Sequence, residues 1–205
     1  MNRTLIILLA LFMIFNVALI VRLKKEPATA SSDDIEGLEA ISTMMINSFY
    51  FQMESEGASI DRSLLLTAEN GEVISVKELF RRKGSPLLIM RYSYIDCTPC
   101  IDYQVEYLRQ MADSVGQNHV VILATYQSPR DLSIFKRINN ITFPVYSIPA
   151  GSTGIPAEDY GSPYIFISDE SLQVRCFHIP LKEIPALTQV FRFQVPQIFR
   201  RISGE

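Results

Sequence analysis

Cys97 and Cys100 are separated by two residues in the sequence CTPC, and they are the residues of this chain best suited to chemistry. The apolar run 86–92 before them predicts a buried strand, and apolar residues at helical spacing follow from Ile101. A Cys-x-x-Cys pair at a strand-to-helix junction places the first thiol at the positive end of a helix, which favours the thiolate. The thiolate attacks disulfides, and the second cysteine is close enough to displace it from a mixed disulfide. The spacing therefore predicts redox chemistry.

Other interpretations of this pair have different requirements. A zinc site normally needs a second ligand pair, whereas Cys176, His119 and His178 are scattered singly, so no metal is expected. A purely structural disulfide would close a very short loop and give little entropic stabilisation. Cys176 is expected to be a small buried hydrophobe and His178 a surface or loop histidine, although a copper site of Cys97, Cys100 and His178 is an alternative. A relic motif on a scaffold that only binds also stays open.

Composition limits the class of protein. The chain has 205 residues, of which 48% are hydrophobic, which suits one packed domain plus a membrane attachment. Its net charge of −3 gives no sign of a nucleic-acid partner. Three cysteines are too few for a disulfide scaffold.

The N-terminus carries an apolar stretch, residues 4–21, with Asn16 as its only strongly polar side chain. Its length is at the lower limit for crossing a bilayer core of about 30 Å. We expect a single transmembrane helix that acts as an uncleaved signal anchor. A signal peptide cleaved near Ala28-Thr29-Ala30 is the alternative, but three basic residues lie between the apolar run and that site.

Two opposing arguments bear on the orientation of the anchor in the membrane. Arg22, Lys24 and Lys25 after the apolar run favour a cytoplasmic C-terminal side. The N-terminal amine and Arg3 nearly balance them, and long domains are translocated largely regardless of flanking charge. Because disulfides persist outside the cytoplasm, we expect an extracytoplasmic domain.

The sequence pattern predicts an organisation in three parts: an anchor at 1–25, a linker with a juxtamembrane helix at 26–59, and a domain at 60–205. Within the domain, apolar runs and turn residues alternate in a way that predicts an α/β fold with a mixed sheet. The expected strands are 64–67, 73–74, 86–92, 119–125, 143–147, 163–168 and 173–177. The expected helices are 35–51, 76–82, the helix after Cys97, 129–139 and 181–193.

Residues 60–195 resemble the thioredoxin-like superfamily, in particular the membrane-anchored thiol–disulfide oxidoreductases and redoxins of bacterial envelopes. The resemblance rests on the N-terminal hairpin with Asn70-Gly71, on the strand leading into the CTPC sequence, and on Gly161-Ser162-Pro163 before an apolar strand. In that family, a Gly-x-Pro at this place supplies a cis proline that faces the Cys-x-x-Cys, and Pro163 matches it. The resemblance implies that Ser162 and Pro163 dock an extended substrate as an added strand.

The chain departs from the family pattern in ways that concern the tuning of the site. Asp96 stands where most members have Trp, and a carboxylate beside Cys97 should raise the pKa of its thiol. Arg91 stands where thioredoxins carry a buried acid that shuttles a proton to the second cysteine. An Arg91 side chain that points beneath the site would favour a thiolate. One that points to solvent would leave the site without a proton shuttle. Thr98 and Pro99 lie between the cysteines, and Pro99 should stiffen the helix start.

The resemblance implies a thiol–disulfide oxidoreductase that uses its cysteine pair and no other cofactor. Its expected partners are protein thiols and disulfides of the cell envelope, and its expected place is the bacterial inner membrane, single-pass, with the domain facing the periplasm. A non-catalytic adaptor or copper-handling module is the alternative. A peroxiredoxin-like peroxidase is disfavoured because Tyr94 stands where that family has Thr or Ser.

Overall fold

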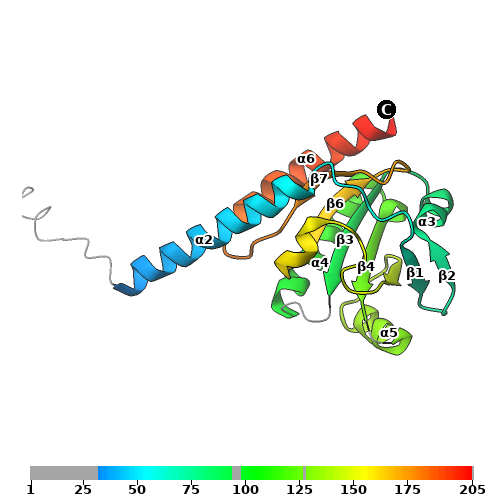
Figure 1. Ribbon diagram of the computed structural model, residues 1–205, viewed down its shortest axis with the longest axis horizontal. Helices are drawn as coiled ribbons and strands as arrows, with labels where there is room; N and C mark the ends of the chain where they lie inside the picture. The colour runs from blue at the N-terminus through cyan, green and yellow to red at the C-terminus, as the bar shows by residue number, and fades with distance from the viewer. Residues whose placement is uncertain (1–31, 94–97, 127, 205) are drawn as a thin grey trace, which may run out of the picture. The chain divides into compact units, whose positions relative to one another are not determined.

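The computed structural model describes residues 32–93, 98–126 and 128–204 (Figure 1). The expected membrane anchor at 4–21 lies outside these ranges, and none of the helices within them has the length and apolar character needed to span a bilayer. The chain divides into two compact units, Met1–Thr43 and Met44–Glu205. The expected boundaries at residues 25 and 59 stay a prediction.

Seven strands form one mixed sheet in the order β2-β1-β5-β4-β3-β6-β7 (Figure 1). β3 lies inside the sheet, parallel to β4 and antiparallel to β6. Both β3 and β4 are almost entirely buried, as continuous apolar runs predict for strands covered on both faces. The expected mixed α/β sheet is therefore confirmed. The strands are β1 (Leu65–Ala68), β2 (Val73–Ser75), β3 (Leu87–Ser93), β4 (Val120–Thr125), β5 (Val145–Ser147), β6 (Tyr164–Ser168) and β7 (Val174–His178).

Helices flank the sheet and divide the core into two clusters. Leu88 and Met90 of β3 pack with the three helices α4, α5 and α6, whereas Leu87 and Ile89 pack on the other face with α3 and η2. By the alternation of a strand, Arg91 points to the side of Leu87 and Ile89. The helices are α2 (Ser32–Ser55), α3 (Val76–Lys83), α4 (Thr98–Val115), α5 (Pro129–Ile138) and α6 (Pro185–Ser203), with short 3-10 helices at η1 (Gln117–His119) and η2 (Pro156–Tyr160).

The expected N-terminal hairpin is present as β1 and β2, which pair antiparallel. At its turn Gly71 has φ of 83°, a conformation that glycine adopts without steric cost. Asn70 contributes through its side chain, whose Oδ1 accepts a hydrogen bond of 3.0 Å from the N–H of Glu72. The Asn-Gly pair thus closes the hairpin with a positive φ at the glycine and a side-chain hydrogen bond from the asparagine.

Ser75 caps α3 directly after the hairpin, because its Oγ accepts a hydrogen bond of 3.2 Å from the N–H of Glu78. We expect Ser75→Ala to lower the free energy of unfolding by about 1 kcal/mol, since a helix N–H loses its partner. Ser75→Asn retains a capping oxygen and should leave most of that stability in place. Urea unfolding followed by circular dichroism measures both; equal losses in the two variants would contradict a capping role.

The C-terminal helix differs from its expected range of 181–193. α6 begins at Pro185 and continues through Pro196 to Ser203. A proline inside a helix removes one helical hydrogen bond and so disfavours continuation of the helix. Here Val195 and Phe199 are buried against the sheet on either side of the proline, so tertiary packing holds the helix together.

The chain that leaves α2 runs along the outer side of β7. The N–H of Gly57 donates to the carbonyl of Val174 and the N–H of Val174 to the carbonyl of Ala58, each at 2.8 Å. The carboxylate of Glu56 accepts the N–H groups of Cys176 and Phe177, at 3.0 and 2.8 Å. These contacts attach the C-terminal end of α2 to the sheet.

Candidate functional site

The Cys-x-x-Cys sequence lies at the junction of β3 and α4. β3 ends at Ser93 and α4 begins at Thr98, with the backbone of Cys100 in its first turn. This is the expected strand-to-helix junction, at which free N–H groups and the helix dipole favour an anion. Cys97 and Asp96 lie outside the described residues, as do the side chains of Thr98, Pro99 and Cys100. The roles assigned to these residues stay predictions.

Ser162 and Pro163 lie directly before β6, next to the same end of β3. Tyr164, the first residue of β6, pairs with Arg91, and Ser162 shares a cavity with Ser93. The fold thus brings the expected docking segment to the end of the strand that leads to the cysteines. Its function in docking stays a prediction.

The expectation of a cis bond at Pro163 is wrong. Among the described residues the cis peptide bond is Ser85–Pro86, and Ser162–Pro163 is trans. The trans form is favoured for X–Pro bonds in general, and the choice of isomer depends on tertiary context that a Gly-x-Pro pattern does not contain.

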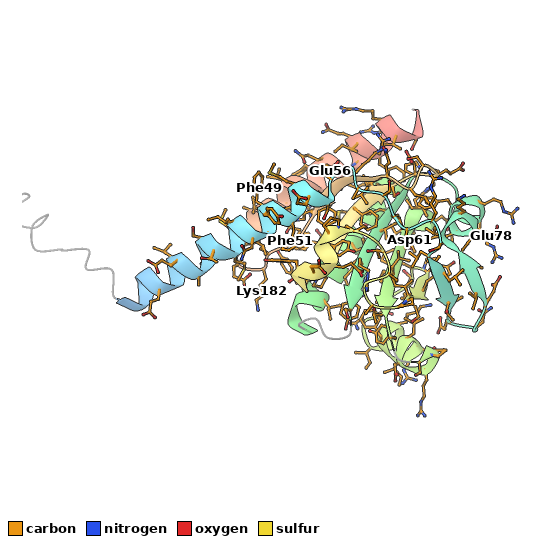
Figure 2. The ribbon with its side chains drawn as sticks, in the orientation of Figure 1. Phe49, Phe51, Glu56, Asp61, Glu78 and Lys182 are labelled. Atoms are coloured by element: carbon orange, nitrogen blue, oxygen red, sulfur yellow. The ribbon has the colours of Figure 1, made fainter. Side chains whose placement is uncertain are left out.

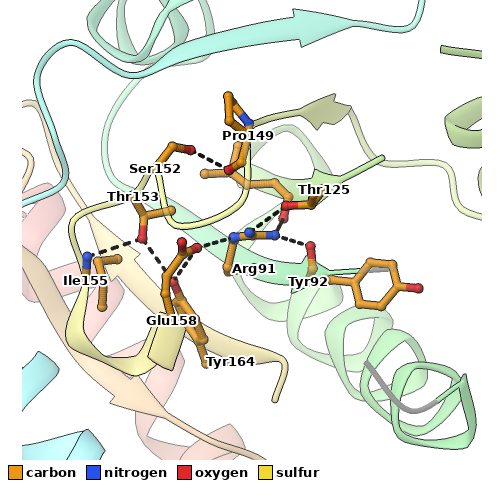
Figure 3. A network of polar contacts seen from close by, with 10 residues as sticks. Arg91, Tyr92, Thr125, Pro149, Ser152, Thr153, Ile155, Glu158 and Tyr164 are labelled. Carbon is orange, nitrogen blue, oxygen red and sulfur yellow. Dashed lines mark hydrogen bonds and ion pairs between the residues drawn. The ribbon is translucent and has the colours of Figure 1, made fainter. Parts of the chain in front are cut away.

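Arg91 is buried and fully engaged (Figure 3). Its Nε donates to Glu158 Oε1 at 2.5 Å, and one terminal nitrogen donates to Thr125 Oγ1 at 2.7 Å. The other terminal nitrogen donates to the carbonyl oxygen of Tyr92. The guanidinium points into the protein and not to solvent, and a carboxylate neutralises its charge. Any electrostatic support of a thiolate by Arg91 is therefore offset in part by Glu158.

Glu158, which comes from η2, was missed by the sequence interpretation. Its side chain is 10% exposed, and its Oε1 also accepts a hydrogen bond of 3.4 Å from the hydroxyl of Tyr164. That hydroxyl contacts Thr153 Oγ1 at 3.3 Å, and burial raises the pKa of Tyr164. An arginine inside a buried apolar run indicates that a counter-ion exists. Nothing in the sequence indicates that the counter-ion is the acid 67 residues further on.

Glu158 Oε2 is buried and, within the described residues, has no hydrogen-bond partner. It faces Gly151, at which a Cβ would lie 4.0 Å from this oxygen. Glu158, Gly151, Ser93 and Ser162 line a cavity of about 80 Å³. The cavity is large enough for a water molecule at the end of β3, beside Ser162.

His178 does not lie on the surface or in a loop, as expected, but is 5% exposed at the end of β7. Its Nδ1 contacts Gln52 Oε1 at 3.3 Å and its Nε2 contacts Thr188 Oγ1 at 3.1 Å. Its ring stacks on Phe191 with 4.6 Å between centroids. Packing of α2 and α6 over the end of β7 buries this histidine. The contacts with Gln52 and Thr188 occupy both ring nitrogens of His178. The other ligands of the alternative copper site, the side chains of Cys97 and Cys100, lie outside the described residues.

The burial of His178 predicts an acid-sensitive fold. Burial lowers the pKa of His178 from 6.5 to about 4. Below pH 6.5 the unfolded chain therefore binds a proton that the folded chain does not bind until about pH 4. We expect the free energy of unfolding to fall by about 3 kcal/mol from this residue as the pH drops through that window.

Urea unfolding at a series of pH values measures this slope. His178→Gln keeps a hydrogen-bonding side chain but cannot titrate, so the variant should lose this part of the pH dependence. An equally steep slope in the variant would show that other groups cause it.

Cys176 is half-buried in β7 and packs against the core on the α4 side. Burial and the nearby Glu56 raise the pKa of Cys176 to about 12, so its thiol stays protonated at neutral pH. Tyr92 is buried and stacks on Phe135 with 5.2 Å between ring centroids. Both residues serve packing.

No protein-family model matches the sequence, and no curated protein matches it significantly. Solved structures do match. A protein assigned as the thiol:disulfide interchange protein DsbE from Chlorobium tepidum has a TM-score of 0.53 at 19% identity, over 70% of this chain and 98% of that one. A protein from Aquifex aeolicus that is assigned as an electron transfer protein has a TM-score of 0.52 at 14% identity, over 70% of this chain and 95% of that one.

A thiol:disulfide interchange protein from a Bacteroides species has a TM-score of 0.50 at 14% identity, over 69% of this chain and 91% of that one. At these identities the similarity concerns the fold. This similarity, together with the mixed sheet and its flanking helices, shows that the described part of the chain has a thioredoxin-like α/β fold.

Proposed function

We propose that this chain is a membrane-tethered thiol–disulfide oxidoreductase that exchanges disulfides with protein partners of the bacterial cell envelope. The observation that carries the proposal is the position of the CTPC sequence, which spans the start of α4 after β3 in a thioredoxin-like fold. Thiol:disulfide interchange proteins are among the solved structures with this fold.

The proposed reaction has two exchange steps. The Cys97 thiolate attacks one sulfur of a partner disulfide, forms a mixed disulfide with it and releases the other sulfur as a thiolate. Cys100, as a thiolate, then attacks the Cys97 sulfur and releases the partner's second thiolate. Two electrons pass to the partner, the protein keeps a Cys97–Cys100 disulfide, and the released thiolates take protons from water. The reverse sequence oxidises a dithiol partner.

The surroundings of the cysteines have supporting parts in this proposal. Ser162 offers backbone groups to an extended partner segment, and Pro163 beside it has no backbone N–H that could donate a hydrogen bond. Asp96 opposes thiolate formation at Cys97, whereas the N-terminus of α4 favours it. The proposed anchor, residues 4–21, would hold the domain on the periplasmic side of the inner membrane.

The experiment that tests the proposal is a redox titration of the purified protein in glutathione or dithiothreitol buffers. A reduction potential of about −270 mV or below would indicate a reductase, and one of about −120 mV an oxidase. A Cys97–Cys100 pair that forms no disulfide in any buffer would contradict both directions. That result would leave the adaptor or copper-handling alternative, which metal analysis of the reduced protein tests.

A further inference from the structure

Exposed apolar side chains gather on two helices that the redox proposal does not use. Elsewhere in the described part of the chain, large apolar side chains are exposed only at Leu65 and Val73 on the β1–β2 hairpin and at Ile138 on α5. Scattered exposure of that kind is ordinary, whereas a contiguous group marks an interaction surface. In the second unit the group consists of Met45, Ile46, Phe49, Tyr50 and Met53 on α2 and Leu187, Val190 and Phe193 on α6.

The two helices share a groove whose lining includes Met45, Ile46, Phe49, Leu187 and Val190, and Tyr50, Met53 and Phe193 are exposed on the same two helices. The groove measures about 490 Å³, with Phe49 on the α2 side, Val190 on the α6 side and His178 between them. Figure 2 shows Phe49 and Phe51 on opposite sides of α2. Phe51 packs on Tyr160 with 5.3 Å between ring centroids. α2 therefore uses one side for the core and presents the other, also apolar, to the surroundings; we call this surface the α2–α6 face.

The charge of α6 indicates what the α2–α6 face contacts. In a chain of net charge −3, α6 has no acidic residue and carries Arg192, Arg200 and Arg201. Within the described residues none of these arginines forms an ion pair. Arg192 donates a hydrogen bond to Gln110 Oε1 on α4, and its Cζ lies 5.3 Å from the ring centroid of exposed Phe193. Apolar side chains next to uncompensated arginines are the pattern of helices that lie on anionic membranes.

We infer that the α2–α6 face rests on the surface of an anionic lipid bilayer. The apolar side chains of the face enter the boundary between headgroups and acyl chains, and the arginines of α6 bind lipid phosphates. A second copy of this chain fits less well, because it would bring a further set of α6 arginines to the interface. Between residues 44 and 55, α2 offers only Glu54 as an acid to pair with them. The inference goes beyond disulfide exchange and concerns how the domain lies on the membrane.

The test uses single tryptophans, because the natural chain has none. Phe49→Trp and Phe193→Trp report on the face, and both sites are about two-thirds exposed, at 64% and 65%, so folding should persist. Ile138→Trp on α5, at a site 74% exposed, is the matched control. Each full-length variant is reconstituted into phosphatidylglycerol vesicles with and without brominated acyl chains. We expect loss of most of the emission at 49 and 193 in brominated vesicles, and little loss at 138.

A second arm tests the charge. In the Phe193→Trp protein, replacement of Arg192, Arg200 or Arg201 by Gln should lower the ratio of docked to undocked protein about fivefold per arginine in phosphatidylglycerol vesicles. Arg130→Gln and Arg137→Gln on α5 are the controls and should change nothing. Vesicles of phosphatidylcholine should show weaker quenching than phosphatidylglycerol vesicles in the unmodified background.

The outcomes separate the alternatives. Equal quenching at all three tryptophans, or none at 49 and 193, overturns the inference, as does failure of the protein to associate with vesicles. Blue-shifted emission at 49 and 193 without bromolipid quenching, together with cross-linked dimers, would overturn it in favour of a second copy. Disulfide exchange assayed in the same samples reports on Cys97 independently, so failure of the redox proposal leaves this test intact.

Discussion

Cys97→Ser is expected to lose essentially all disulfide-reductase activity, measured as dithiothreitol-dependent reduction of insulin. Serine has no thiolate at neutral pH, so the attack that opens the partner disulfide cannot occur. Cys100→Ser keeps the attacking sulfur but lacks the resolving one. This variant should therefore accumulate a mixed disulfide with its partner, visible by mass spectrometry and released by dithiothreitol.

Cys176→Ser is the matched control for these variants. Cys176 is half-buried and its pKa is raised to about 12, so it contributes little thiolate. The control should keep its activity. Full activity in Cys97→Ser, or loss of activity in Cys176→Ser equal to that in Cys97→Ser, would contradict the assignment of Cys97 as the nucleophile.

Glu158→Ala is expected to lower the free energy of unfolding by about 3–5 kcal/mol, the largest stability effect that we predict. The substitution leaves the Arg91 guanidinium buried without a counter-ion, because Arg91 and Glu158 side chains are 5% and 10% exposed. It also removes the acceptor of the Tyr164 hydroxyl. Urea unfolding followed by circular dichroism measures the loss.

The double variant Arg91→Met/Glu158→Leu separates the cost of an unpaired charge from the cost of lost packing. Replacement of a buried ion pair by apolar residues of similar volume is often nearly neutral. We therefore expect the double variant to be more stable than Glu158→Ala. A double variant at least as unstable as the single one would show that the pair stabilises the fold through contacts other than its charges.

The same pair shows what the sequence can and cannot predict about the site. The strand of Arg91 and the helix after Cys97 follow from apolar periodicity, which is local, whereas the segment with Ser162 is identified through the resemblance. The counter-ion in η2 and the burial of His178 depend on contacts between distant segments. So does the continuation of α6 through Pro196, where packing of Val195 outweighs the local effect of proline.

The isomer of the Ser162–Pro163 bond likewise depends on contacts between distant segments and not on the local sequence. The resemblance implies a cis proline at this segment, but the bond is trans in this structure. A residue pattern specifies which side chains are present, whereas the small difference between X–Pro isomers is decided by the surrounding fold.

The chain that follows α2 has a consequence for this protein at high concentration. An edge strand with free N–H and C=O groups is a template onto which a neighbouring molecule can add its own strand and begin to aggregate. At the β7 edge, Gly57, Ala58 and the Glu56 carboxylate already occupy backbone groups of that strand. The opposite edge is β2, which is only three residues long. We therefore expect this protein to resist edge-to-edge polymerisation even at high local density.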